Sequence, residues 1–220
     1  MFLVAITSLR RVSELQALTT AEPYMQIHKD KVALRTNPHF LPKVATSFHV
    51  NQTIYLPAFF QHPKDNAERM LHTLDVRRAL IYYLSQTNGI RKGNQLFVAF
   101  AGATKGSPVT KATIARWIAR TIELCYSKAG KELVERPKAH STRKKGATIA
   151  FQANLPLSDI CLAATWSSTH TFMKHYCVDF HFNKEAQVGQ KVLGHLFAST
   201  TSQPNRPSAS ETATKSMHSM

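Results

Sequence analysis

The spacing of apolar residues is the feature of this sequence that most restricts its fold. From residue 66 onward, apolar side chains recur mainly at three- and four-residue intervals, as Ile114, Ile118 and Ile122 do. That interval is the period of an amphipathic helix. Between residues 24 and 56 the pattern changes to short extended runs separated by turn residues. The sequence therefore predicts a mainly α fold with a small antiparallel β-sheet of two or three strands.

Periodicity and capping residues also predict where the elements lie. Thr110 is a candidate N-cap for a long helix, and Pro42 indicates that its own run is an edge strand, because proline cannot donate to a neighbouring strand. We expect extended runs at 31–35, 40–44 and 53–56, and helices at 1–18, 66–87, 110–130, 140–154, 158–166, 169–176 and 188–198. Residues 1–199 are expected to form one domain. Residues 200–220 are rich in Ser, Thr, Pro and Asn and are predicted to be a disordered tail.

The charge balance points to a polyanionic partner. Lys and Arg number 28 against 13 acidic residues, which gives a formal net charge of +15. Each phosphate that a basic surface neutralises releases counterions and adds affinity that does not depend on base sequence. The charge thus favours a nucleic-acid-binding protein, with a basic soluble protein of another kind as the alternative.

Cysteine usage and hydropathy limit the compartment. The cysteines are Cys125, Cys161 and Cys177, an odd number without Cys-x-x-Cys spacing, which argues against a disulfide framework or a zinc site. Reduced thiols in the nucleus or cytosol are expected. The apolar run at 1–6 is too short for a signal peptide, and no stretch approaches the roughly 20 apolar residues of a membrane span.

Two short clusters could address a phosphate. In the first, Arg11 and Glu14 are three residues apart and would share a helix face, although such spacing also fits an ordinary surface pair. In the second, His140 and Arg143 are spaced so that both would point the same way from the first turn of a helix. A helix N-terminus favours anions, but a surface capping turn is an equal alternative for this cluster.

A third cluster runs from Trp166 to Tyr176 and includes Phe172. Taken alone, these aromatic residues fit a role in the core, with polar groups at their edges. Their place in the chain adds information, because they follow the two clusters that contain arginine.

The order Arg11, His140-x-x-Arg143, Trp166, Tyr176 resembles the constellation of the tyrosine recombinases, also called phage-type integrases. Several segments further resemble recombinases of DIRS-type and Ngaro-type retrotransposons, over about residues 3–196. These segments are 40–44, 47–49, 74–80, 139–143 and 172–176. The resemblance implies a tyrosine recombinase catalytic-domain-like α+β fold and a nuclear protein of a mobile element, which integrates or recombines DNA.

The resemblance also implies a reaction on double-stranded DNA that needs no metal or cofactor. Tyr176 would attack a phosphodiester and form a 3′-phosphotyrosine link, which a 5′-hydroxyl later reverses. Arg11 and Arg143 would clamp the phosphate, with His140 hydrogen-bonded to it or assisting loss of the tyrosine proton. Trp166 would donate its indole N–H to a phosphate oxygen. Glu14 would support the arginines, and several copies, commonly four, would assemble on DNA.

A lysine of the small sheet would act as general acid for the leaving 5′-oxygen. Lys43 is the first candidate, because its Phe-Leu-Pro-Lys surroundings carry part of the resemblance. Lys29 and Lys31, which lie around the start of the first extended run, are the alternatives, and Lys105 is a weaker one.

Two features depart from the family pattern. The chain starts at the first arginine-containing segment, so we expect the domain that normally precedes it to be missing. Lys144 and Lys145 follow Arg143 where small residues would allow close helix packing. One alternative is therefore an inactive, truncated relic that binds DNA without cleaving it. A basic structural protein, with these residues scattered, is the last alternative.

Overall fold

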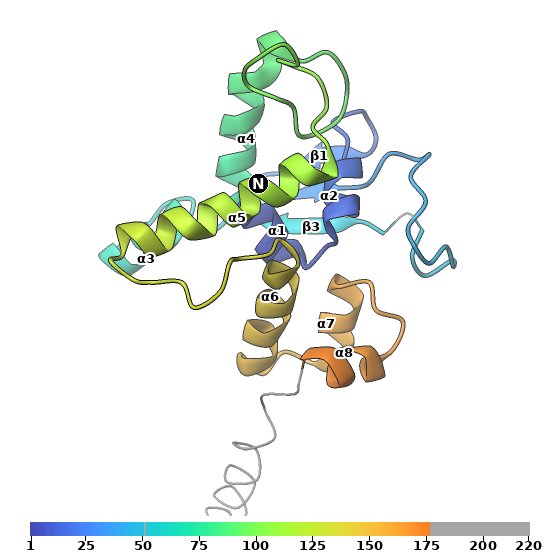
Figure 1. The fold of residues 1–220 in the computed structure, drawn as a ribbon, viewed down its shortest axis with the longest axis vertical. Helices are drawn as coiled ribbons and strands as arrows, with labels where there is room; N and C mark the ends of the chain where they lie inside the picture. The colour runs from blue at the N-terminus through green and yellow to red at the C-terminus, as the bar shows by residue number, and fades with distance from the viewer. Residues whose placement is uncertain (51, 177–220) are drawn as a thin grey trace, which may run out of the picture. The chain divides into compact units, whose positions relative to one another are not determined.

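The computed structural model describes residues 1–50 and 52–176. The elements in this part of the chain are, in order, α1 (Phe2–Ser8), α2 (Val12–Ala17), β1 (Met25–Ile27), β2 (Lys31–Leu34), β3 (Ile54–Pro57), α3 (Asn66–Thr73), α4 (Val76–Thr87), the 3-10 turn η1 (Asn88–Ile90), α5 (Lys111–Lys128), α6 (His140–Gln152), α7 (Leu157–Ala163) and α8 (Thr169–Tyr176) (Figure 1). The predicted mainly α fold with a small antiparallel sheet is confirmed.

The sheet has the order β1-β2-β3, and both pairings are antiparallel. Leu34 of β2 lies opposite Met25 on one side and Ile54 on the other. The runs expected at 31–35 and 53–56 correspond to β2 and β3. The strand predicted at 40–44 is wrong, because that segment is an irregular loop with a bend at its end, and its Leu41 is 74% exposed. Its apolar residues bury little surface, and β1 takes the edge position instead.

Two predicted helices are each broken into two. The helix expected at 1–18 ends at Leu9, which has a left-handed backbone (φ 56°), and restarts as α2 with Arg11 as its N-cap. The helix expected at 66–87 breaks before Asp75. The carboxylate of Asp75 accepts from the N–H of Arg78 at 2.8 Å and from that of Phe59 at 3.0 Å. Apolar spacing continues across both breaks, so periodicity alone did not reveal them.

The later helices follow the sequence closely. Thr110 caps α5 by accepting from the N–H of Thr113 at 3.2 Å. Helices α6 and α8 lie within the ranges predicted for them, and α7 begins at Leu157, one residue earlier than predicted. The predicted helix at 188–198, Cys177 and the predicted tail at 200–220 lie outside the described residues. Within residues 1–50 and 52–176, no helix combines the length and the apolar character that crossing a bilayer requires.

The main core lies where α1 and α4 pack against β3 and where α5 packs against α1 and α2. Its fully buried side chains include Leu15, Leu18, Leu34, Leu56, Ile114 and Ile118. Helices α6, α7 and α8 pack against one another, and α6 also packs against α1 (Figure 1). Helix α1 therefore contacts both the sheet and α5, α2 contacts α5, and α6 brings the α6–α8 layer against α1.

Gly146 makes the contact between α6 and α1 close. A Cβ atom at this position would lie 2.6 Å from the backbone oxygen of Ile6 and 2.5 Å from a methyl group of Leu9. Small residues that allow this packing do follow Arg143, but as Gly146 and the buried Ala147 and not at the two positions directly after it. Lys144 and Lys145 are exposed and leave this packing undisturbed.

Candidate functional site

The turn between α1 and α2 positions Arg11. The backbone N–H of Arg11 donates to Oε2 of Glu14 at 2.8 Å, which closes the first turn of α2. Arg11 therefore stands at the N-cap, with an extended backbone (φ −69°, ψ 152°), and does not share a helix face with Glu14 as the spacing predicted. The Glu14 carboxylate holds the backbone from which the Arg11 side chain emerges.

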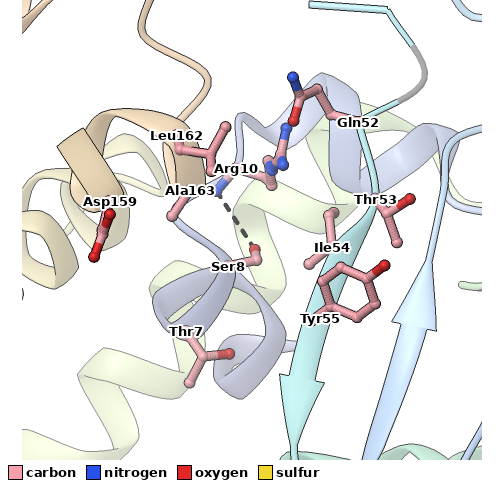
Figure 2. Close-up of a pocket in the computed structure, with 10 residues that line it drawn as sticks. All are labelled: Thr7, Ser8, Arg10, Gln52, Thr53, Ile54, Tyr55, Asp159, Leu162 and Ala163. Carbon is pink, nitrogen blue, oxygen red and sulfur yellow. Dashed lines mark hydrogen bonds between the residues drawn. The ribbon is translucent and has the colours of Figure 1, made fainter.

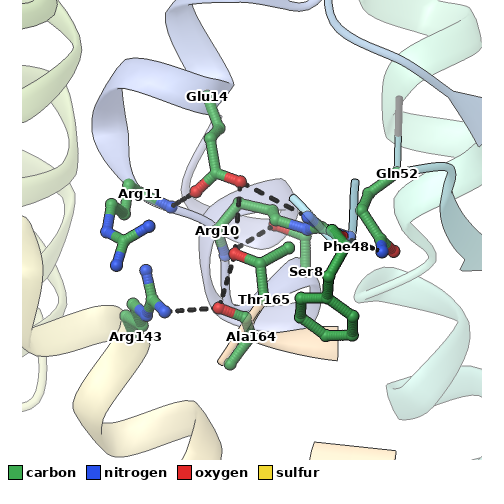
Figure 3. A network of polar contacts seen from close by, with 9 residues as sticks. All are labelled: Ser8, Arg10, Arg11, Glu14, Phe48, Gln52, Arg143, Ala164 and Thr165. Carbon is green, nitrogen blue, oxygen red and sulfur yellow. Dashed lines mark hydrogen bonds and ion pairs between the residues drawn. The ribbon is translucent and has the colours of Figure 1, made fainter. Parts of the chain in front are cut away.

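A chain of polar contacts links this turn to α6 (Figure 3). Oε1 of Glu14 lies 3.3 Å from the Nη1 of Arg10 and accepts from the hydroxyl of Thr165 at 3.4 Å. The same hydroxyl lies 2.7 Å from the carbonyl oxygen of Ala164, to which Arg143 also donates. Arg10, Glu14, Thr165 and Arg143 are all at most 5% exposed. The network thus connects residues that are about 150 positions apart in the sequence.

Trp166 lies beside the guanidinium of Arg143. The guanidinium carbon is 4.8 Å from the centre of the indole, within the range of a cation–π contact. Trp166 is 4% exposed and its ring packs against Phe172 of α8, which in turn packs against Phe151 of α6. The aromatic cluster therefore connects the guanidinium of Arg143 to α8, and α8 back to α6.

His140 is the first residue of α6 and is exposed to solvent. Partial burial lowers its pKa, and the positive charges of Arg143 and then Arg11 lower it further. Figure 3 shows the guanidinium groups of Arg11 and Arg143 pointing toward one another. The two guanidinium groups thus converge, and His140 lies near enough to both for their charges to lower its pKa. Such a grouping of like charges is suited to hold an anion with several oxygens.

Tyr176 is the last residue of α8, and its side chain lies outside the described residues. The backbone of α8 packs against α6 and α7, so this helix belongs to the layer that carries Arg143. The assignment of Tyr176 as nucleophile stays a prediction.

The candidate lysines lie at different places around the sheet. Lys43 is exposed in the connection between β2 and β3, and not on a strand as predicted. Lys29 lies between β1 and β2, and Lys31 is the first residue of β2, where it pairs with Asp30 at 3.8 Å. Lys105 is in the loop that precedes α5. The choice of general acid among them stays a prediction.

Sequence reasoning missed Arg10 and Thr165. The doublet Arg10–Arg11 offered a signal, but it could not show which arginine would be buried. Thr165 offered none, because its part in the network depends on an unusual left-handed backbone (φ 51°), which a β-branched residue rarely adopts. Strained backbone of this kind often occurs at functional sites.

A basic groove lies along α5 and leads to the start of α6. It has a volume of about 680 Å³, and its lining includes Arg116, Arg120, Arg136 and Lys138. All four of these side chains are exposed. The lining also includes Ala139, the residue directly before His140, so the groove ends at the start of α6.

No protein-family model matches the sequence, and no curated protein is significantly similar to it. Solved structures of recombinases do match its fold. The XerH site-specific recombinase bound to palindromic difH substrate, a post-cleavage complex, matches at a TM-score of 0.56 and 18% identity, over 84% of this chain and 43% of that one. The XerA recombinase matches at 0.56 and 15% identity, over 85% of this chain and 55% of that one.

A pre-cleavage complex of XerH with difH matches similarly, at a TM-score of 0.54 and 18% identity, over 84% of this chain and 44% of that one. The chain thus spans about half the length of the recombinases that it matches. The part of the chain that the structure describes has the fold of a tyrosine recombinase catalytic domain.

Proposed function

We propose that this chain is a tyrosine recombinase catalytic domain that cuts and rejoins double-stranded DNA through a covalent 3′-phosphotyrosine intermediate on Tyr176. The observation that carries the proposal is that the guanidinium groups of Arg11 and Arg143 converge, with His140 near enough to both for their charges to lower its pKa. This convergence occurs within a fold shared with site-specific recombinases.

The two arginines are suited to stabilise the transition state. Phosphoryl transfer spreads negative charge over the non-bridging oxygens, and preorganised cationic donors stabilise that charge. A guanidinium presents a planar set of N–H donors and stays charged across the working pH range. In this proposal Arg11 and Arg143 bind the phosphate, so the reaction proceeds without a metal or cofactor.

The bond changes balance without an external energy source. The hydroxyl oxygen of Tyr176 bonds to phosphorus while the bond from phosphorus to the 5′-oxygen breaks, and that oxygen takes up a proton from a lysine, with Lys43 the first candidate. His140 binds the phosphate or accepts the tyrosine proton, which a phenol with a pKa of about 10 does not release readily at neutral pH. Attack by a 5′-hydroxyl reverses the step and regenerates Tyr176.

His140 is suited to accept a proton because its lowered pKa favours the neutral imidazole. Glu14 supports the clamp through its contact with the backbone of Arg11. Trp166 is assigned an indole N–H contact to a phosphate oxygen, and its ring also stacks beside Arg143.

The DNA would continue from the cleaved phosphate onto the basic groove along α5. The exposed cations of Arg116, Arg120, Arg136 and Lys138 can neutralise backbone phosphates on either side of the reacting one. The net charge of +15 supports the same partner.

We further assign residues 1–199 as the catalytic domain of a nuclear protein from a mobile element of the DIRS or Ngaro type, acting as a tetramer on DNA. The support is the resemblance of segments 40–44, 74–80, 139–143 and 172–176 to recombinases of those retrotransposons.

The direct test is a search for a covalent protein–DNA adduct. The protein is incubated with a library of randomised duplexes that carry nicks, so that a cleaved strand loses a short fragment and the reverse reaction is blocked. Adducts are isolated under denaturing conditions, the attached DNA is sequenced, and the modified peptide is identified by mass spectrometry. We expect a phosphotyrosine link at Tyr176.

Tyr176→Phe should abolish the adduct, whereas the matched Tyr82→Phe, at a 66% exposed tyrosine of α4, should leave it unchanged. Salt-sensitive DNA binding with no adduct on any duplex would contradict the proposal and support the inactive relic. An adduct that survives Tyr176→Phe would contradict the assignment of the nucleophile.

A further inference from the structure

Arg10 is buried beside the candidate site, and the reaction proposed above gives it no role. It is 5% exposed, and its Nη1 contacts Oε1 of Glu14 at 3.3 Å. Burial lowers the pKa of Arg10, and the charge of Glu14 opposes that shift. A buried arginine that pairs with a buried glutamate needs an explanation, because desolvating two charges is unfavourable unless the pair serves the structure or a site.

The side chain of Arg10 does not join the converging cluster. It lines a different pocket of about 420 Å³, whose walls include Gln52, Tyr55 and Asp159. Figure 2 shows its guanidinium directed toward Gln52, and Figure 3 shows Arg10 and Arg11 on different sides of the Glu14 carboxylate. Arg10 is therefore placed to act on Glu14, and not to bind the phosphate that Arg11 addresses.

Glu14 is the point through which Arg10 can influence the site. One carboxylate oxygen faces Arg10 and Thr165, and the other accepts from the backbone N–H of Arg11. A buried carboxylate needs a countercharge, and within the described network Arg10 supplies it by an ion pair. Loss of that charge would allow Glu14 to move, which would release both the N-cap at Arg11 and the turn that precedes Trp166.

We propose that Arg10 is a positioning residue, which holds Glu14 so that Arg11 and the Ala164–Thr165 turn keep the geometry needed to clamp the phosphate. This inference rests on the proposed function. Shifts of about 1 Å in a clamp can slow a reaction roughly a hundredfold, so a loosened Glu14 should affect the cleavage step more than DNA binding.

The test compares cleavage and binding in four variants, on a duplex with which the wild-type protein forms its adduct. Arg10→Met removes the charge and keeps much of the side-chain length. Arg10→Lys keeps the charge. Arg10→Met combined with Glu14→Gln removes both charges. Arg69→Met makes the same change at an exposed arginine of α3 and serves as the matched control. Single-turnover cleavage at saturating DNA, DNA affinity and thermal melting are measured for each.

We expect Arg10→Met to slow cleavage at least about tenfold at saturating DNA, with an affinity within about twofold of wild type. Arg10→Lys should recover part of the rate, because the pair uses only Nη1 while Nε is buried without a hydrogen bond within the described residues. The double variant should cleave faster than Arg10→Met alone, because no unpaired buried charge is left. Arg69→Met should behave as wild type.

Four results would overturn the assignment of Arg10. The first is an unchanged cleavage rate in Arg10→Met, and the second is a slower rate that returns to the wild-type value after correction for the folded fraction. The third is a weaker DNA affinity in Arg10→Met with a normal cleavage rate at saturating DNA. The fourth is a double variant that cleaves no faster than Arg10→Met. Failure of the proposed function would look different, because the wild-type protein would then form no adduct at all.

Discussion

Two arginine–glutamate pairs of similar length lie in very different surroundings. Arg10 and Glu14 are 3.3 Å apart, with side chains 5% and 7% exposed. Arg120 and Glu123 of α5 are 3.5 Å apart, with side chains 67% and 31% exposed. The first pair lies inside the network that connects α2 to the turn before Trp166, and the second lies on the wall of the basic groove.

The difference shows how one pair of residue types can serve two purposes. An exposed pair contributes little to stability, because water and salt screen it, so Arg120 can exchange Glu123 for a phosphate with little loss. Separating a buried pair costs much more free energy, because each partner is left as a buried charge without a countercharge. The buried pair therefore suits positioning, whereas the exposed pair suits reversible binding.

The sharpest test of this contrast is the removal of each glutamate. Glu14→Ala should lower the free energy of unfolding by about 3–5 kcal/mol, because Arg10 is left buried and unpaired. Glu123→Ala should change it by less than about 1 kcal/mol. Urea unfolding followed by circular dichroism measures both, and equal small losses would show that burial does not distinguish the two ion pairs.

In the buried region, Arg143→Lys should slow single-turnover cleavage by about a hundred- to a thousandfold. A lysine ammonium cannot stack beside Trp166, donate to Ala164 and bind a phosphate with the planar geometry of a guanidinium. The rate is measured as adduct formation at saturating DNA. Arg69→Lys on α3 is the matched control, and a near-normal rate in Arg143→Lys would remove Arg143 from the clamp.

The packing of the buried region is tested by adding one methyl group. Gly146→Ala should lower the free energy of unfolding by about 1–3 kcal/mol, because the new Cβ meets the backbone of Ile6. Gly89→Ala, where a Cβ would meet nothing within 4 Å, should stay within about 0.5 kcal/mol of wild type. Thermal unfolding of both variants measures the difference. An unchanged free energy of unfolding in Gly146→Ala would show that α1 and α6 can move apart without loss of stability.

The exposed region should respond to salt and not to denaturant. Arg116→Ala and Arg120→Ala should each reduce the slope of log affinity for DNA against log salt by about 1, because each removes one phosphate contact. Neither should change the free energy of unfolding by more than about 0.5 kcal/mol. Binding isotherms at several salt concentrations measure the slope, with Arg69→Ala as control. Unchanged slopes would show that the DNA does not bind in the basic groove along α5.

The smallest expected effect is on the titration of His140. Its pKa is lowered by partial burial, by Arg143 and by Arg11, so the folded protein favours the neutral imidazole. The stabilisation that follows is present above the unfolded value of about 6.5 and is lost as the pH falls through the range below it. Arg11→Met should raise the pKa of His140, as measured by NMR of its Cε1 proton.

Arg69→Met provides the control for this titration and should leave it unchanged. If the pKa of His140 did not rise in Arg11→Met, the two side chains would not be close enough in solution to share one phosphate.

The fold class and the later helices could be predicted because their signals are local. The recurrence of Ile114, Ile118 and Ile122, and the hydroxyl of Thr110 that caps their helix, lie within a few turns of one another. The same holds for α6, in which His140 and Arg143 occupy one turn. The candidate site residues could likewise be proposed from their order along the chain, although their roles stay predictions.

The remaining features depend on contacts between residues that lie far apart in the sequence. Local propensity does not tell Arg10 from its neighbour Arg11, and the burial of one follows from a carboxylate that also contacts Thr165, 151 positions further on. The break at Leu9, the irregular loop at 40–44 and the close approach of Gly146 to Ile6 arise in the same way. The spacing of apolar residues shows which face of an element is apolar. Tertiary packing determines which element that face contacts and which charged groups become buried.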